Sequence, residues 1–309
     1  MLPQIRMFGK LFTNKTFNTV YNNIPQKIFI AGMGGSAMAG TLLQQLMPHL
    51  NITVTKDYKT ESQRGDLVIA CSYSGNTEET LSAVYDAVSK GCTVYCITSG
   101  GKLEEYADQH GLHYILVDEG YQPRAALPLM FTALYSIFEQ YDFSELAEYL
   151  QIVGASFEKE TSLARSIAEL FHKKLPLVYT DASFEPIGIR WRNQLNENSK
   201  MFALNNVLPE LCHNEIVPDG KHQPLDTGVV VIEDKLYNDR IEKRIRILKE
   251  HIWKSVIVVS CDHKNKLFRY FYYILLGDYV SYFLAELNNE DSVTVTNIDL
   301  LKEKLGPYL

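Results

Sequence analysis

Hydroxyl side chains gather in one short segment of the chain, Cys71-Ser72-Tyr73-Ser74-Gly75-Asn76-Thr77-Glu78-Glu79-Thr80. Three of them, Ser72, Ser74 and Thr77, lie where an apolar run meets the start of a helical pattern. Hydroxyls together with the backbone N–H groups of a helix start can surround a phosphate group without any lysine or arginine. Because one hydroxyl is enough to cap a helix, the three predict a site for a phosphorylated small molecule.

A glycine-rich turn, Gly32-Met33-Gly34-Gly35-Ser36-Ala37-Met38-Ala39-Gly40, precedes this loop in the chain. Glycines allow close backbone approach, so Gly35 and Ser36 are expected to add to the phosphate site. The turn also fits the G-x-G-x-x-A dinucleotide fingerprint, with Asp57 as a candidate ribose-binding acid. An NAD(P)-dependent dehydrogenase is therefore an alternative, but that fold has no need of a second, hydroxyl-rich loop.

Short apolar runs alternate with helical patterns along the whole chain. Strands are expected at 28–31, 53–55, 67–72, 92–97, 114–117, 175–179, 228–232 and 255–259. Helices are expected at 36–47, 77–89, 102–109, 124–140, 161–171, 187–196, 238–251, 267–287 and 298–305. Strands that alternate with helices in this way are typical of βαβ units. The sequence therefore predicts an α/β protein of two domains, 1–145 and 146–309, each a parallel sheet flanked by helices.

The charge balance restricts the class of partner. The chain has 30 Lys and Arg against 37 Asp and Glu, which gives a formal net charge of −7. Because nucleic acids are bound by many basic residues, we expect no nucleic-acid partner. The net charge does not exclude one small phosphate, since hydroxyls and amides can hold it locally.

The cysteines and the apolar segments indicate where the protein acts. Five cysteines without a CxxC pair are typical of reduced thiols in a cytoplasmic protein, and no signal peptide is expected at the N-terminus. The most apolar stretch, 268–287, is interrupted by Arg269, Asp278 and Glu286. We therefore expect a helix of the core or of a subunit interface there, and no membrane span.

Motifs in both halves resemble one family. GMGGSAMAG at 32–40, SYSGNTEETL at 72–81 and PRAAL at 123–127 resemble a sugar isomerase (SIS) domain. RWRNQLNENSK at 190–200 and PELCHNE at 209–215 sharpen the resemblance to the bifunctional phosphoglucose/phosphomannose isomerases, which form a branch of the phosphoglucose isomerase superfamily.

This resemblance covers nearly the whole chain and implies two SIS-type domains, the N-terminal one binding phosphate and the C-terminal one carrying the catalytic base. The implied reaction is aldose–ketose isomerisation of hexose 6-phosphates, glucose 6-phosphate and fructose 6-phosphate and also mannose 6-phosphate, through a cis-enediol(ate). The substrate would be bound by Gly35, Ser36, Ser72, Ser74 and Thr77.

The reaction needs a base that moves a proton between C2 and C1 and a group that stabilises the enediolate. The resemblance assigns these roles to Glu197 and Arg124. The permanent, delocalised charge of a guanidinium suits the second role. His213 would assist ring opening, because its ordinary pKa lets it exchange protons near neutrality, and Lys302 would contact the same region. In the superfamily this histidine comes from the neighbouring subunit, which implies a homodimer with shared active sites.

One segment departs from the family pattern. Where the family has Asp-Pro-Thr-Pro, this chain has Asp291-Ser292-Val293-Thr294, which leaves the use of the mannose epimer an open question. An enediol route needs no metal, so we expect no cofactor and no metal site. The alternative from another class is a non-catalytic SIS module that senses phosphosugars, which would keep the phosphate loop without needing Glu197 or His213.

Overall fold

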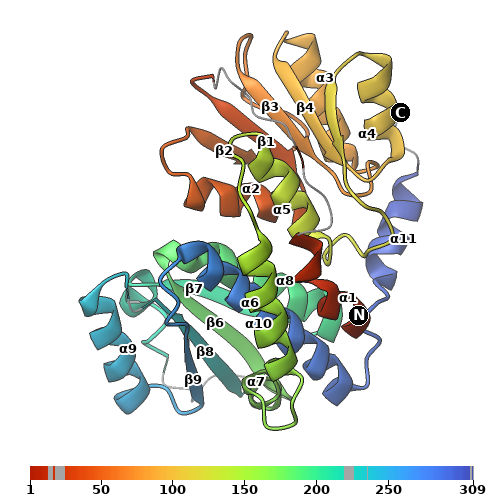
Figure 1. Cartoon of the computed structure of the whole chain (residues 1–309). Coiled ribbons are helices and arrows are strands. Elements are labelled where there is room, and N and C mark those ends of the chain that lie inside the picture. Colours follow the sequence, from red (N-terminus) through yellow and green to blue (C-terminus); the bar gives the residue numbers. More distant parts are fainter. Residues whose placement is uncertain (13–16, 18–24, 219–225, 235, 307, 309) are drawn as a thin grey trace. The chain divides into compact units, whose positions relative to one another are not determined.

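The alternating apolar and helical segments form two separate parallel sheets in the computed structural model (Figure 1). The structure describes residues 1–12, 17, 25–218, 226–234, 236–306 and 308. The chain divides into two compact units, which are described separately. Unit 1 comprises Met1–Arg6 and Leu150–Lys304, and unit 2 comprises Met7–Tyr149 and Leu305–Leu309.

Unit 2 contains a five-stranded parallel sheet in the order β2-β1-β3-β4-β5. Its strands are β1 (Ile28–Gly32), β2 (Ile52–Thr55), β3 (Leu67–Cys71), β4 (Thr93–Thr98) and β5 (His113–Leu116). Its helices are η1 (Lys10–Phe12), α2 (Gly34–Leu46), α3 (Glu78–Ser89), α4 (Gly101–Gln109) and α5 (Leu127–Ser136). The core of the α3 and α4 face joins apolar side chains of the strands to both helices, among them Phe29, Val68, Leu81 and Leu103.

Unit 1 contains a four-stranded parallel sheet in the order β7-β6-β8-β9. Its strands are β6 (Leu175–Asp181), β7 (Leu204–Leu208), β8 (Thr227–Glu233) and β9 (Val256–Ser260). Its helical segments are α1 (Leu2–Met7), α7 (Leu163–Phe171), η2 (Ala182–Phe184), α8 (Glu185–Ser199), η3 (Glu210–His213), α9 (Asp239–His251), α10 (Lys266–Asn288) and α11 (Thr296–Leu305). The helix α6 (Ser144–Phe157) spans the division between the units.

The two-sheet architecture confirms the predicted fold class, and the structure adds elements that the sequence did not predict. Among them are the helix α1, the strand β7 and the helix α6, which spans the predicted boundary between residues 145 and 146. The predicted helix over 124–140 is shorter, because α5 begins at Leu127 and ends at Ser136.

The long helix α10 is buried along most of its length, as expected for a core helix. Its partners are α7 and α8. The indole N–H of Trp191 donates to the backbone oxygen of Tyr273 at 2.8 Å, and the absence of a side chain at Gly277 leaves room for the indole ring. Among the described residues, no helix combines the length and the apolarity that a membrane span needs.

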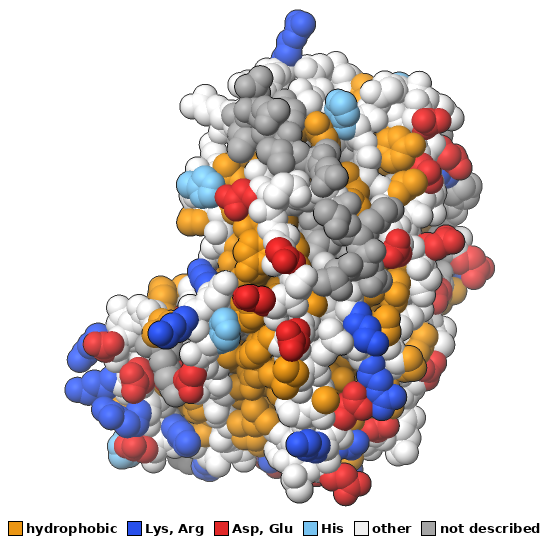
Figure 2. Space-filling model, viewed as in Figure 1, with side chains coloured by type: hydrophobic (Ala, Val, Ile, Leu, Met, Phe, Trp, Pro, Cys, Tyr) orange, Lys and Arg blue, Asp and Glu red, His pale blue; other side chains and the backbone are white. Residues whose placement is uncertain are grey.

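The surface of α9 carries both signs of charge. Figure 2 shows acidic and basic side chains side by side over this helix, whose sequence is DRIEKRIRILKEH. Its buried side chains, Ile241, Ile245 and Leu248, pack on the sheet. The exposed face of α9 is therefore mixed in charge and is not a basic stripe of the kind that binds nucleic acid.

Candidate active site

The glycine-rich turn and the hydroxyl-rich loop meet at the carboxyl ends of β1 and β3. Gly32 and Cys71 are register partners in these neighbouring strands, so both loops start at the same edge of the sheet. The backbone N–H of Tyr73 donates to Ser36 Oγ at 3.3 Å and links the loops directly. This is the point where the strand order reverses, which is where parallel α/β sheets bind ligands.

The two helices that begin at this edge have no side-chain caps. The N-cap residue of α2 is Met33 and that of α3 is Thr77, and neither side chain accepts a hydrogen bond from its helix. The Thr77 hydroxyl instead accepts a hydrogen bond from Ser72 Oγ at 2.9 Å. Because the first N–H groups of a helix lack intrahelical partners and lie at the positive end of the helix dipole, this edge suits an anion.

Two glycines allow the loops to approach each other and their neighbours. A Cβ on Gly35 would lie 3.0 Å from the backbone oxygen of Pro123, next to Arg124. Gly75 has a φ of +67°, and a Cβ there would overlap the backbone oxygen of Gly100. Side chains at either position would displace the segments that surround the hydroxyl cluster.

Tyr73, which sequence reasoning did not single out, organises the segment that leads to Arg124. Its hydroxyl donates to the backbone oxygen of Asp118 and accepts from the N–H of Tyr121, both at 3.0 Å. Arg124 follows on this segment and is only 5% exposed. The only signal in the sequence was an aromatic residue between two loop serines.

In unit 1, Glu197 lies in the last turn of α8 and is half-buried. A row of buried polar residues on α8 ties this helix to α10. Arg190 pairs with Asp278 at 3.1 Å, Gln194 donates to the same carboxylate at 2.7 Å, and Asn198 donates to Ser281 Oγ at 2.9 Å. Their spacing of four residues places them on one face, so these bonds set the rotation of α8 and the direction in which Glu197 projects.

A cavity of about 500 Å³ opens beside Glu197. One wall is the end of α8 and the residues after it, Asn196, Glu197, Lys200, Met201 and Phe202. The other wall is the start of α11 with the residue before it, 295–298. The segment that departs from the family pattern, 291–294, leads directly into that second wall.

His213 and Lys302 do not line this cavity. His213 ends η3, which follows β7, and is exposed. Lys302 lies in α11 and is also exposed. The structure thus groups the predicted phosphate-binding residues and Arg124 in unit 2, while Glu197, His213 and Lys302 belong to separate elements of unit 1.

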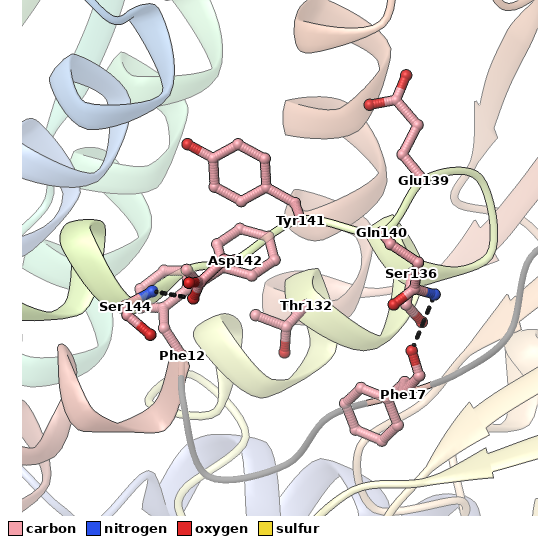
Figure 3. A pocket seen from close by; sticks show the side chains of 10 residues that line it. Phe12, Phe17, Thr132, Ser136, Glu139, Gln140, Tyr141, Asp142 and Ser144 are labelled. Carbon is pink, nitrogen blue, oxygen red and sulfur yellow. Dashed lines mark hydrogen bonds between the residues drawn. The ribbon is translucent and has the colours of Figure 1, made fainter.

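A second cavity, of about 390 Å³, lies in unit 2 where α5 leads into α6 (Figure 3). It contains none of the predicted site residues. Its polar side chains form local hydrogen bonds: Gln140 donates to the backbone oxygen of Phe17 at 3.1 Å, and Asp142 accepts the N–H of Ser144 at 2.9 Å. Aromatic residues, among them Phe12 and Phe143, form the rest of its lining.

The alternative sites from the sequence can also be located. Asp57 is exposed and follows β2, next to β1, where a ribose-binding acid stands in dinucleotide folds. In the part of the chain that the structure describes, no group of three or more His, Cys, Asp and Glu side chains is placed to hold a metal ion.

Comparisons with known proteins match both units. The family model of the SIS domain matches residues 24–140, and that of the bacterial phospho-glucose isomerase C-terminal SIS domain matches residues 160–305. Among solved structures, the C-terminal domain of glucosamine-fructose-6-phosphate aminotransferase from Francisella tularensis has a TM-score of 0.68. It is 16% identical, with 96% of this chain and 97% of that one covered, so it is evidence for the fold alone.

Two curated relatives match over almost their full length, and both are bifunctional phosphoglucose/phosphomannose isomerases. The protein from Caldicellulosiruptor bescii is 37% identical, with 98% of this chain and 96% of the relative covered. The protein from Thermoplasma acidophilum is 33% identical, with 98% and 94% covered. Identity at this level over nearly both whole chains shows that this protein belongs to the bifunctional phosphoglucose/phosphomannose isomerase family.

Proposed function

We propose that the protein is an isomerase that interconverts glucose 6-phosphate and fructose 6-phosphate, and mannose 6-phosphate and fructose 6-phosphate, through a shared cis-enediol(ate). The observation that carries this proposal is the near-complete match to relatives of that name. The uncapped starts of α2 and α3 beside the hydroxyl cluster support it independently, because they suit the phosphate of such a substrate.

The phosphate is held in unit 2. Gly35 offers its backbone, while Ser36, Ser72, Ser74 and Thr77 offer hydroxyls. The Tyr73–Ser36 bond and the Ser72–Thr77 bond support this assignment, because they draw residues from both loops into one cluster. The positive ends of the two helix dipoles balance part of the dianion's charge.

Proton transfer needs a base and a group that stabilises the enediolate. Glu197 removes the proton from C2 and returns it to C1, and Arg124 stabilises the negative oxygen of the enediolate. His213 assists ring opening by exchanging protons at the ring and anomeric oxygens, and Lys302 contacts the same region. The cavity beside Glu197 supports the assignment of the base, since a base needs space for a substrate within hydrogen-bond reach.

Both aldose epimers give the same enediol, because glucose 6-phosphate and mannose 6-phosphate differ only at C2. Protonation of opposite faces of C2 gives the two epimers, so one base serves both substrates when the enediol turns about its C2–C3 bond and presents either face to Glu197. The segment 291–294 leads into the wall of the cavity beside Glu197. We propose that it influences the ratio of the two activities, which separate coupled assays of glucose 6-phosphate and mannose 6-phosphate formation would measure.

The decisive experiment is turnover of fructose 6-phosphate by the purified protein in EDTA, with incorporation of solvent deuterium at C2 of the product. Glu197→Gln removes the base and should abolish both signals while hexose 6-phosphate still binds. Glu185→Gln, an exposed position at the other end of α8, is the matched control and should retain activity. Binding without turnover by the wild-type protein would favour the phosphosugar sensor, and direct reduction of a nicotinamide would favour the dehydrogenase.

The enzyme is proposed to act as a cytoplasmic homodimer in which His213 serves the partner's active site. Free cysteines at all five positions agree with a reducing compartment. Mixing inactive Glu197→Gln and His213→Ala proteins tests the shared sites, because half the sites of each mixed dimer regain both residues. Random exchange should then restore about a quarter of wild-type activity; no recovery after subunit exchange would place His213 in its own chain's site.

A further inference from the structure

Lys200 ends α8 in the left-handed backbone conformation, with φ 56° and ψ 30°. Its own N–H and the N–H of Met201 both return to the backbone oxygen of Leu195, which closes the helix end. Glycine is the usual residue in this place, because a side chain with a Cβ is strained there by roughly 1 kcal/mol or more. The contacts of the Lys200 side chain can offset this strain.

The side chain of Lys200 forms two hydrogen bonds to separate segments. Its ammonium group donates to the backbone oxygen of Glu197 and to that of Asp291, each at 2.7 Å. The Glu197 oxygen belongs to the last turn of α8, where carbonyl groups lack intrahelical partners and the helix dipole favours a cation. Lys200 therefore connects the turn that carries Glu197 to a segment 91 residues further along the chain.

Asp291 makes the receiving segment a stiff turn. Its carboxylate accepts the N–H of Val293 at 2.9 Å and that of Thr294 at 3.3 Å. These hydrogen bonds, the one from the Val293 backbone first, hold the pKa of Asp291 below its ordinary value. A proline at position 294, as in the family pattern, would have no N–H to donate. In the family pattern, prolines restrain this turn by fixing φ. In this chain, the hydrogen bonds to Asp291 restrain it instead.

The two connected segments lead to opposite walls of the cavity beside Glu197. One part of the lining comes from Asn196, Glu197 and residues 200–202, and the other comes from residues 295–298. Because Lys200 bonds to both Glu197 and Asp291, it restrains the separation of these walls. Displacement of a reacting group by about 1 Å can reduce a rate roughly 100-fold, so this separation matters for a proton transfer by Glu197.

We propose that Lys200 is a positioning residue, whose ammonium group holds the Glu197 turn at a set distance from the 291–294 turn. This inference rests on the proposed role of Glu197 as the base. Lys200 acts through Glu197 and through the cavity wall, and it takes no proton in the reaction.

The test replaces Lys200 by glycine, which accepts the left-handed backbone and removes only the crosslink. Lys200→Gly should lower kcat roughly 10- to 100-fold, change KM for fructose 6-phosphate by less than about 3-fold, and leave Tm unchanged or higher. Lys200→Arg keeps a cation with several donors and should recover most of kcat.

Lys173→Gly is the matched control, because Lys173 is also left-handed, with a φ of 60°, and is exposed like Lys200, but its side chain forms no hydrogen bond among the described residues. Its kcat should equal that of wild type. The proposal is overturned if Lys200→Gly retains full kcat, if Lys173→Gly loses as much, or if Lys200→Arg recovers nothing. Inactive Glu197→Gln beside fully active Lys200→Gly would overturn the role of Lys200 alone, whereas an inactive wild-type protein would overturn both proposals.

Discussion

The two parallel sheets share one plan but differ in the residues at the carboxyl ends of their central strands. In each sheet the strand order reverses between two central neighbours, β1 and β3 in unit 2 and β6 and β8 in unit 1. The strands of unit 2 end at Gly32 and Cys71, followed by the hydroxyl loop. The strands of unit 1 lead into Asp181 and Asp234, which are both buried.

In unit 1, carboxylates accept hydrogen bonds from the backbone N–H groups that follow the strands. In unit 2, the helix starts at the corresponding places have no side-chain cap. Asp181 accepts the N–H of Ser183 at 2.7 Å and so caps the turn after β6. Asp234 accepts the N–H of Leu236 at 3.0 Å and pairs with Arg269 at 3.2 Å. One topology thus leaves helix starts without side-chain caps where hydroxyls and glycines stand, and carries hydrogen-bonded carboxylates where acids stand.

The largest effect is expected when an acid is placed in the hydroxyl loop of unit 2, which makes it resemble the corresponding position of unit 1. Ser72→Asp introduces a negative charge at the proposed phosphate site, and like charges in contact cost several kcal/mol. We expect KM for fructose 6-phosphate to rise about 100-fold or more. Ser72→Asn, of similar size but neutral, is the control for burial at this position, and equal KM values for the two variants would contradict a phosphate at Ser72.

A smaller effect should follow from closing the space at Gly35. In Gly35→Ala the new methyl group meets the backbone oxygen of Pro123 at 3.0 Å, so the segment that carries Arg124 must shift by a few tenths of an ångström. We expect kcat/KM to fall about 10-fold. Gly154→Ala is the control, because its nearest contact, to Leu275, is 3.5 Å. Unchanged kinetics of Gly35→Ala would show that this approach is not needed for catalysis.

Removal of the Tyr73 hydroxyl should also disturb the segment that carries Arg124, with a smaller loss of activity. Tyr73→Phe loses the hydrogen bonds to Asp118 and Tyr121, and a hydrogen bond contributes about 1 kcal/mol. We expect kcat to fall about 5-fold, with binding of inorganic phosphate retained. Tyr135→Phe is the control, because among the described contacts its hydroxyl bonds only to Glu139. This variant should keep the kcat and the phosphate binding of wild type, and an equal loss of kcat would argue against a specific role for Tyr73.

The smallest effect concerns stability at the acidic cluster of unit 1. Burial raises the pKa of Asp181, so the folded protein keeps this proton to a higher pH than the unfolded chain does. The ionisation of Asp181 therefore destabilises the fold as pH rises above about 4. We expect Asp181→Asn to be more stable than wild type at pH 7, by less than about 2 kcal/mol, and the difference to disappear towards pH 4 in urea unfolding.

Asp142→Asn in unit 2 should change stability in the opposite direction at neutral pH. Hydrogen bonds from Ser144 hold the pKa of Asp142 below its ordinary value, so the ionised group stabilises the fold at neutral pH and this contribution is lost as pH falls. Its replacement should therefore destabilise the protein at pH 7 and have less effect near pH 4. The same pH trend in both variants would contradict the contrast between the two acids.

The elements that the sequence predicted and those it did not differ in their local signal. Runs such as IFIA and VVVI are buried on both faces and stand out as strands. The edge strand β7 has the sequence LNNVL, in which two asparagines interrupt the apolar pattern, and it forms because β6 offers it backbone partners. The helix α6 lies across the predicted domain boundary, where the sequence pattern predicts no helix.

The chemistry-bearing residue types were evident from the sequence alone, since hydroxyls and glycines at a strand–helix junction have local meaning. What only the tertiary structure decided is which of them meet. Ser36 and Tyr73 are 37 residues apart in the chain, and they bond because β1 and β3 pair in parallel register. Lysine has no intrinsic preference for the left-handed conformation, so no local pattern marks Lys200. Its left-handed conformation at the end of α8 is accompanied by a contact to Asp291, which only the folded chain provides.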